Sequence, residues 1–170
     1  MARTADVMLA GFSAAGGWND LTPATARREV EASLVPDRIS RVACLDGEIV
    51  GWIGGEESYE GNVFELHPLV VVPAHQHEGI GRALVLDFEA CVRERGIRTV
   101  TLGADDESAQ TSLGGIDLYP DPLGHVTTIR NLAGHPFTFY TELGYVVVGV
   151  IPDANGFGKP DIIMAKRLDL

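Results

Sequence analysis

Basic residues are scarce in this sequence. Lys and Arg number 13 against 24 Asp and Glu, which gives a formal net charge of −11 at pH 7. Proteins that bind nucleic acids neutralise phosphates with clustered Lys and Arg, and no such cluster occurs here. We therefore expect no nucleic-acid partner. The acidic balance fits either simple solubility or a cationic ligand that is attracted to a negative site.

Cysteine is scarce as well, and no apolar run is long enough to span a membrane. Cys44 and Cys91 are far apart and belong to no CxxC pair, which favours reduced thiols and a cytoplasmic protein. The apolar stretch that begins at Val7 is preceded by Asp6 and interrupted by Gly11. We interpret it as an amphipathic first helix and expect no membrane partner.

Metal-binding motifs are also missing. The five histidines are scattered, and only His75 and His77 lie close together. There is no HExxH motif and no Cys/His ligand set, so we expect no metal ion.

The hydrophobic pattern predicts a single domain, residues 1–170, of the α+β class. Thr22 is expected to cap a second helix that ends near Leu34, and Asp46-Gly47 to form a hairpin turn. The other expected helices cover residues 4–14, 79–95 and 135–144. Expected strands lie at 38–46, 48–57, 99–104, 145–151 and 161–168, with two extended stretches between 62 and 72 and a long functional loop at 104–130.

The stretch VVVPAHQHEGIGRALV, residues 70–85, predicts a binding loop between a strand and a helix. It lacks the Lys and Ser/Thr of a P-loop, and Leu84 stands where a dinucleotide fingerprint needs a small residue. A third design remains, in which main-chain N–H groups at the helix start hold a diphosphate and Gly79 and Gly81 let the backbone approach it. The alternative is a plain loop before a helix that starts with glycine.

The spacing Gln76-x-x-Gly79-x-Gly81 after a strand resembles the acetyl-CoA signature of the GNAT acetyltransferases. The segments ELHPLVVVPAHQ, LGADDES and NLAGHPFTFYTELGYVVVGVIPDANGFGKPDIIMAKRL resemble the aminoglycoside 6'-N-acetyltransferases of that superfamily, from about Trp18 to Leu168. The resemblance implies the GNAT fold, with αβα layers around a central, mixed but mostly antiparallel sheet that splays at the acetyl-CoA strand. It also implies acetyl-CoA as cosubstrate, an aminoglycoside as acceptor, and a homodimer.

The same resemblance implies roles for single residues. Glu65 corresponds to a base or amine-orienting carboxylate, Tyr140 to a general acid for the coenzyme A thiolate, and the Leu69 N–H to an oxyanion donor. Val71 is expected to pair its backbone with pantetheine. The expected cofactor-binding residues are Leu69, Val71, Gln76, His77, Glu78, Gly79, Ile80, Gly81 and Arg82. Glu65 as a solvated strand residue and Tyr140 as a core residue remain alternatives, and Tyr145 is expected in the core.

The acceptor site is expected to neutralise several ammonium groups. Its expected residues are Trp18, Glu65, His67, Asp105, Asp106, Asp121 and Asp153. The alternative for Trp18 is a packing role, and for His67 a strand-orienting or core role. The alternative for the acidic residues is that they face solvent. The predicted activity is acetyl transfer to the 6'-amine of aminoglycoside antibiotics by direct attack in a ternary complex. The alternatives are acetylation of another amine, such as a polyamine or a protein lysine, and an acetyl-CoA-binding module without turnover.

Overall fold

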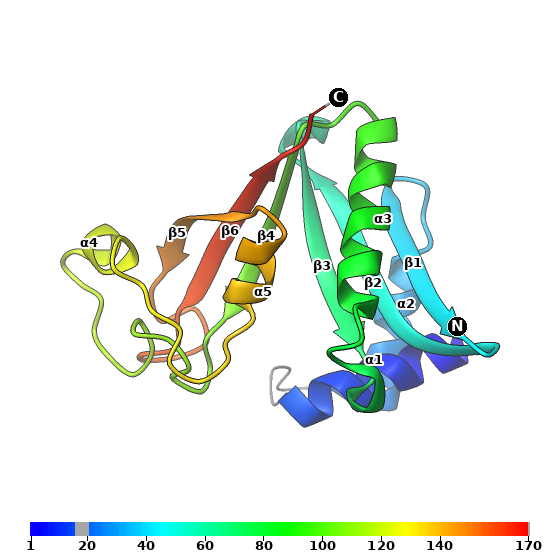
Figure 1. Ribbon diagram of the computed structural model, residues 1–170, viewed down its shortest axis with the longest axis horizontal. Coiled ribbons are helices and arrows are strands. Elements are labelled where there is room, and N and C mark those ends of the chain that lie inside the picture. The colour runs from blue at the N-terminus through cyan, green and yellow to red at the C-terminus, as the bar shows by residue number, and fades with distance from the viewer. Residues whose placement is uncertain (16–20, 170) are drawn as a thin grey trace. The chain divides into compact units, whose positions relative to one another are not determined.

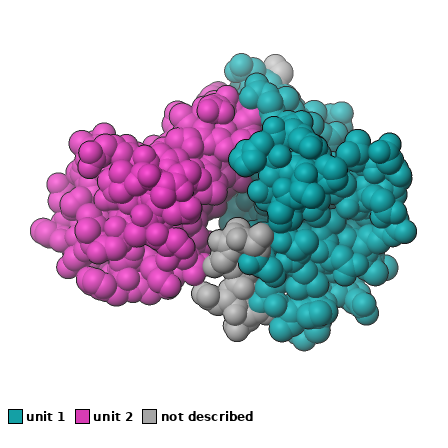
Figure 2. Space-filling view, turned by 60° about the horizontal axis from the view of Figure 1, so that its bottom comes forward, with its two compact units in different colours: residues 1–100, 168–170 teal, residues 101–167 magenta. Residues whose placement is uncertain are grey.

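The computed structural model describes residues 1–15 and 21–169. The packing of the chain divides it into two compact units, one formed by Met1–Val100 with Leu168–Leu170 and the other by Thr101–Arg167 (Figure 2). Each unit is considered by itself below.

Three antiparallel strands form the sheet of the first unit: β1 (Arg38–Leu45), β2 (Glu48–Ser58) and β3 (Val63–Val71). The predicted hairpin turn joins β1 to β2, and Asp46 and Gly47 both have positive φ, at 51° and 82°. Two-residue hairpin turns favour this geometry because its twist matches that of the strands.

A short turn, η1 (Tyr59–Gly61), joins β2 to β3. The prediction of two extended stretches between 62 and 72 is wrong, because a single strand runs through Pro68. Proline cannot donate to a sheet ladder, but it is tolerated where the ladder is already interrupted. The pairing of β2 with β3 shifts register between Ile53 and Gly55, opposite Pro68.

Helices lie on both faces of this sheet (Figure 1). α1 (Ala2–Ala15) and α2 (Pro23–Ala32) lie on one face, and α3 (Ile80–Glu94) lies on the other. Thr22 caps α2 as predicted, since its hydroxyl accepts a hydrogen bond from the Thr25 N–H at 3.2 Å. α2 ends at Ala32, two residues before the predicted end.

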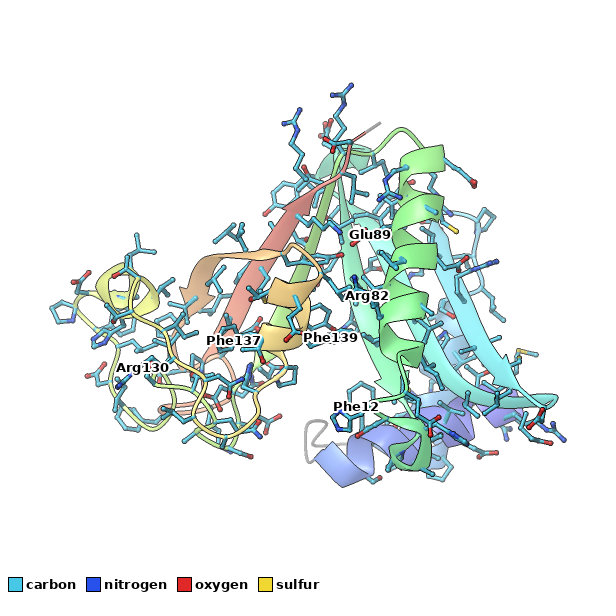
Figure 3. All side chains as sticks on the ribbon, viewed as in Figure 1. Phe12, Arg82, Glu89, Arg130, Phe137 and Phe139 are labelled. Atoms are coloured by element: carbon cyan, nitrogen blue, oxygen red, sulfur yellow. The ribbon has the colours of Figure 1, made fainter. Side chains whose placement is uncertain are left out.

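α3 packs an apolar stripe against the sheet. Phe88 meets Phe64 of β3 edge to face, with ring centroids 5.6 Å apart, a geometry worth about 0.5–1.5 kcal/mol beyond the area buried. Glu89, on the same helix, is also fully buried, and the Arg93 guanidinium lies 3.4 Å from its carboxylate (Figure 3).

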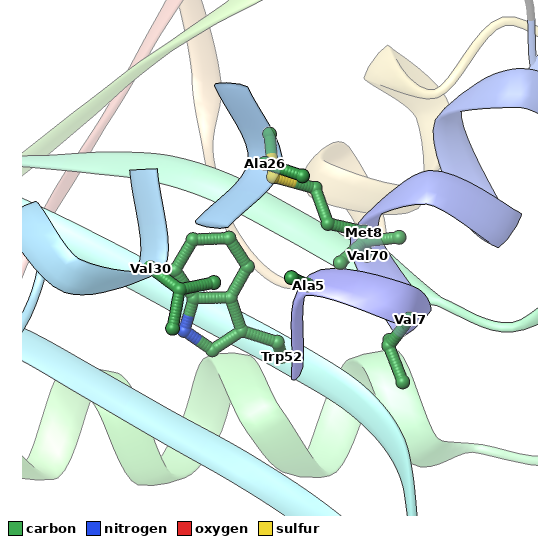
Figure 4. Close-up of a cluster of buried hydrophobic side chains, with 7 residues drawn as sticks. All are labelled: Ala5, Val7, Met8, Ala26, Val30, Trp52 and Val70. Carbon is green, nitrogen blue, oxygen red and sulfur yellow. The ribbon is translucent and has the colours of Figure 1, made fainter. Parts of the chain in front are cut away.

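The opposite face of the sheet has its own apolar cluster. Trp52 of β2 and Val70 of β3 pack against Met8 of α1 and against the buried residues of α2 (Figure 4). The Trp52 indole N–H donates to the Ser40 hydroxyl at 3.0 Å, so the ring is buried without leaving its polar atom unsatisfied. This cluster fixes α1 and α2 on the face of β2 and β3 that carries Trp52 and Val70.

The second unit contains most of β4 (Thr99–Asp105), with β5 (Val146–Ile151), β6 (Asp161–Arg167) and the short helices α4 (Pro122–Val126) and α5 (Phe137–Glu142). β5 and β6 are antiparallel. Among the described residues the strands are hydrogen-bonded in the order β1-β2-β3-β4-β6-β5. The predicted α+β class with a mostly antiparallel mixed sheet is confirmed, whereas α4 was not predicted and the splay of the sheet stays a prediction.

In residues 1–15 and 21–169, no helix combines the length and apolarity that crossing a membrane requires.

Candidate active site

The site residues of β3 are arranged by a bulge. Three residue steps lead from Leu66 to Leu69, whereas only two lead from Gly55 to Ile53 on the paired strand. The extra residue on β3 bends the strand and interrupts the alternation of its side chains. A Cβ at Gly55 would lie 2.4 Å from the Glu65 carbonyl oxygen and 2.6 Å from the Phe88 ring. Glycine is therefore needed beside the bulge.

This bulge assigns Glu65 and Leu69 to opposite faces of the sheet. Directly paired residues of neighbouring strands share a face. Leu69 and Val71 pair with residues of β2 that face α3, whereas Glu65 pairs with Glu56 on the face that carries Trp52. The carboxylate proposed to meet the amine is thus on the α1–α2 face of the sheet.

Glu65 is exposed, and its cross-strand neighbour Glu56 is also acidic. Like charges in direct register destabilise a sheet. Here Arg38 of β1, which pairs with Glu56 in register, forms an ion pair with that carboxylate. Arg38 therefore offsets the Glu56 charge, and a carboxylate can remain at Glu65. This row of three residues is not visible in the sequence, because only the strand register aligns them.

The loop after β3 turns sharply before α3. It begins with a short turn, η2 (Pro73–His75), and both His77 and Gly79 have positive φ, at 63° and 85°. The His75 Nδ1 lies 3.0 Å from a Glu78 carboxylate oxygen. The Gln76 amide donates to the Val71 carbonyl at 3.1 Å. That bond fixes the loop to the end of β3 and uses one of the two acceptor positions of the Val71 carbonyl oxygen.

The start of α3 offers main-chain donors to an anion. The first N–H groups of a helix have no intrahelical acceptor, and Gly79 at the N-cap has no side chain to cap them. The partial positive charge of a helix N-terminus adds to their attraction for phosphate. Arg82, in the first turn, is exposed (Figure 3). The predicted residues 76–82 therefore run from the loop into the first turn of α3, where the uncapped main-chain donors suit a phosphate group.

Tyr140 lies on α5 in the second unit. Its side chain is only 8% exposed and meets the Tyr145 ring edge to face, with centroids 5.7 Å apart. Burial disfavours the phenolate and raises the pKa of Tyr140 well above its ordinary value. The hydroxyl is therefore held in its protonated form, which a proton donor requires. Tyr145 is 1% exposed and belongs to the core as expected.

Asp105 and Asp106 follow one another at the end of β4 but have different surroundings. Asp105 is exposed, and its carboxylate accepts a hydrogen bond from the Asn155 amide. Asp106 is fully buried and accepts from the Gln110 N–H and from the N–H and hydroxyl of Thr111, at 2.7–2.8 Å. A carboxylate enclosed by three donors of its own loop cannot meet a substrate. We therefore exclude Asp106 from the acceptor site and assign it to loop structure.

Two other acidic candidates also make local hydrogen bonds. Asp121 caps α4 by accepting from the Gly124 N–H at 3.0 Å, and Asp153 accepts from the Gly158 N–H at 2.7 Å. Asp121 is exposed and Asp153 half-buried. Each carboxylate thus has a structural partner, and each keeps further acceptor capacity.

His67 is exposed on β3 beside Pro68, and Trp18 lies outside the described residues. Among the residues that the structure describes, no group of three His, Cys, Asp or Glu side chains is placed to hold a metal ion.

A partly exposed polar network at the start of α5 was not predicted. The Asn131 side chain accepts from the N–H groups of Gly134 and His135, at 2.8 and 2.9 Å, and donates to the His135 carbonyl and the Thr138 hydroxyl. The His135 ring is 1% exposed. No sequence periodicity identifies these residues, because their hydrogen bonds are made within an irregular loop.

Comparison with known proteins identifies the family. The model of the Acetyltransferase (GNAT) family matches residues 12–125. A crystal structure of an aminoglycoside 6'-N-acetyltransferase complexed with coenzyme A is 39% identical, covers 99% of this chain and 90% of its own, and superposes with a TM-score of 0.89. The structure of the aminoglycoside 6'-N-acetyltransferase from Enterococcus faecium is 39% identical, covers 99% of this chain and 90% of its own, and has a TM-score of 0.87. The structure of aminoglycoside 6'-acetyltransferase type Ii is 34% identical, covers 99% of this chain and 89% of its own, and has a TM-score of 0.72. A search of curated proteins found no match.

The family match runs from α1 to α4 and includes β3, the loop after it and α3. These are the elements that carry the candidate cofactor residues 69–82. The chain belongs to the GNAT acetyltransferase family.

Proposed function

We propose that the protein transfers the acetyl group of acetyl-CoA to the 6'-amine of aminoglycoside antibiotics, by direct attack in a ternary complex, and so confers resistance. The observation that carries the proposal is likeness along nearly the whole chain to an aminoglycoside 6'-N-acetyltransferase complexed with coenzyme A. The uncapped start of α3 supports it, because this feature suits the diphosphate of that cofactor.

The cofactor is proposed to bind along β3 and the loop after it. The main-chain N–H groups of Gly79, Ile80, Gly81 and Arg82 would hold the pyrophosphate, with Gln76, His77 and Glu78 shaping the turn. Val71 would pair its backbone with pantetheine in the manner of an added strand. The Leu69 N–H would donate to the thioester oxygen, where negative charge develops.

The reaction requires proton transfers from the amine nitrogen and to the departing thiolate. Glu65, directly or through water, accepts a proton from the ammonium group or orients the amine. The amine nitrogen then bonds to the thioester carbon, the nitrogen of the tetrahedral intermediate loses its second proton to water, and the C–S bond breaks. Tyr140 donates its proton to the departing thiolate, and solvent reprotonates the phenolate. The raised pKa keeps Tyr140 protonated before the transfer but also makes it a weaker acid, so the negative charge that develops on sulfur has to drive the donation.

A thermal-shift series with acetyl transfer assays tests the acceptor class. Acetyl-CoA should raise the unfolding temperature, and kanamycin- or tobramycin-like ligands should raise it further. Release of free thiol should follow only when both are present. Stabilisation by polyamines or a lysine peptide instead would indicate another amine acceptor. Stabilisation by acetyl-CoA with no thiol release under any condition would indicate a binding module.

The acceptor site is proposed to bind ammonium groups through Glu65, Asp105, Asp121 and Asp153, with His67 and Trp18 as further contacts. Two unit charges about 4 Å apart attract by about 4 kcal/mol at an effective dielectric near 20, before desolvation and salt reduce the value. Salt should therefore raise the KM for the aminoglycoside much more than that for acetyl-CoA, because the Debye length falls from about 10 Å at 0.1 M to about 3 Å at 1 M.

In 0.1 M salt, Asp105→Asn should raise the aminoglycoside KM about threefold to tenfold, or about 0.7–1.4 kcal/mol. Glu94→Gln is the matched control, because Glu94 is exposed at the end of α3 and changes the net charge equally. An acceptor KM that did not respond to salt in the parent protein would assign the charge of −11 to solubility.

We propose further that residues 1–170 form one catalytic domain, since the family match crosses the boundary between the two units.

A homodimer is proposed through the C-terminal strands. β5 is last in the strand order, and its Val146, Val148 and Ile151 side chains are more than half exposed. Apolar edge strands of this kind favour pairing with another chain, and a monomer mass in sedimentation would contradict the dimer. The free thiols of Cys44 and Cys91 fit a cytoplasmic protein, which cell fractionation tests.

A further inference from the structure

His135 connects the end of β4 to the start of α5. The ring Nε2 lies 3.0 Å from the Asp105 carbonyl oxygen, and the Phe137 N–H donates to the ring Nδ1 at 3.2 Å. Asp105 is the last residue of β4, and Phe137 is the first of α5 (Figure 3). The side chain thus joins two elements that are more than thirty residues apart in the sequence.

These two contacts determine the state of the imidazole. Only an unprotonated Nδ1 can accept from Phe137, so the proton of the neutral ring is on Nε2, which then donates to Asp105. Burial lowers the pKa of His135, although the Asp105 carbonyl and the Asp106 and Asp105 carboxylates act in the opposite sense. The neutral ring therefore persists, and both hydrogen bonds are kept, at neutral pH.

α5 needs such a connection because it has only six residues. A helix this short is not stable alone and takes its position from tertiary contacts. The Asn131 network holds the backbone around His135, and the Tyr140 N–H donates to the Pro136 carbonyl at 3.3 Å within the first turn. The Asn131 network therefore supports the turn independently of the His135 ring, whereas the ring adds one bond within the turn, from the Phe137 N–H, and one bond to β4.

We propose that His135 is a positioning residue for acetyl transfer, which holds α5 on the end of β4 and so places the Tyr140 hydroxyl. This inference rests on the proposed role of Tyr140 as proton donor. A proton donor must be within hydrogen-bond reach of the departing atom, and a displacement of about 1 Å can cost about a hundredfold in rate. His135 itself is 1% exposed, and its ring bonds to β4 and α5, so its effect is proposed to act through Tyr140.

Two substitutions separate the two hydrogen bonds. In His135→Asn the side-chain oxygen can still accept from the Phe137 N–H, but the amide is too short to reach the Asp105 carbonyl. In His135→Gln the longer amide can reach that carbonyl. We expect the kcat of His135→Asn to fall about tenfold or more and that of His135→Gln to stay within about threefold of the parent. Each kcat is calculated per acetyl-CoA-binding site. The KM for acetyl-CoA should change less than twofold in both.

A double-mutant cycle with Tyr140→Phe decides the matter. If His135 acts through the Tyr140 hydroxyl, His135→Asn should slow the parent and have no further effect on kcat in Tyr140→Phe. Losses that multiply, or a His135→Asn enzyme with parental kcat per site, would overturn the inference. An unchanged kcat in Tyr140→Phe alone would overturn the proposed role of Tyr140 instead. If His135→Asn does not fold, the same cycle is measured with His135→Gln. A large loss of kcat in His135→Gln that multiplies with the loss in Tyr140→Phe would overturn the inference, because the glutamine amide can still reach the Asp105 carbonyl.

Discussion

Gly81→Glu should weaken acetyl-CoA binding by at least a hundredfold. Gly81 is the second residue of α3, among the N–H groups that have no intrahelical acceptor. A glutamate there places a side chain and a negative charge where the pyrophosphate is proposed to bind. A hundredfold loss corresponds to about 2.7 kcal/mol, which is less than the repulsion of about 4 kcal/mol between two unit charges about 4 Å apart at an effective dielectric near 20.

The same substitution should not damage the fold. An acidic residue in the first turn interacts favourably with the helix dipole, by about 0.3–1 kcal/mol. Titration calorimetry with acetyl-CoA and thermal unfolding without it give the two quantities separately. Ala90→Glu is the matched control, since Ala90 is exposed later on α3 and the change in net charge is identical. Affinity within twofold of the parent in Gly81→Glu would show that the loop does not hold the pyrophosphate.

Tyr140→Phe should lower kcat by about a hundredfold and leave acetyl-CoA binding nearly intact. General acid catalysis is typically worth about 10²–10⁴-fold, and a thiolate is a fair leaving group, so the lower end applies. The hydroxyl is proposed to act only on the departing sulfur, so its loss should appear in kcat and not in the KM for acetyl-CoA. Single-turnover kinetics measure the chemical step directly.

Tyr145→Phe is the control for this substitution, because Tyr145 is equally aromatic, buried and in contact with Tyr140. It should leave the chemical step within a few-fold of the parent. Burial raises the pKa of Tyr140, so its hydroxyl stays protonated as the pH rises through 10, the ordinary pKa of tyrosine. An alkaline loss of rate below pH 10 that disappeared in Tyr140→Phe would contradict this.

Local patterns predicted the elements that depend on local chemistry. Thr22 has a hydroxyl that can cap a helix, and it does so. Asp46-Gly47 tolerates positive φ, and it forms the hairpin turn. The apolar spacing from Ile80 onward predicted α3 within one residue at each end, because a strong amphipathic stripe specifies a helix wherever a sheet can bury it.

Patterns did not predict contacts between distant segments. Asp106 follows Asp105 in an acidic run that suggested a site for cations, yet the loop closes over it and uses its carboxylate for backbone structure. Likewise, two extended stretches were expected where β3 is a single strand, since its bulge depends on the register with β2. Sequence gives the polarity of such residues, but their neighbours depend on chain segments that meet only in the folded protein.

The sequence by itself determined the class of fold and the place of the glycine-containing loop between β3 and α3, and by resemblance it determined the family. Each of these depends on spacing within about twenty residues or on motifs that the chain carries directly. Only the tertiary structure decided that Glu65 and Leu69 lie on opposite faces of the sheet, that Arg38 neutralises Glu56, and that His135 joins α5 to β4. The physical reason is that strand register and buried hydrogen bonds are set by packing between segments that are distant in the chain, and no local pattern specifies that packing.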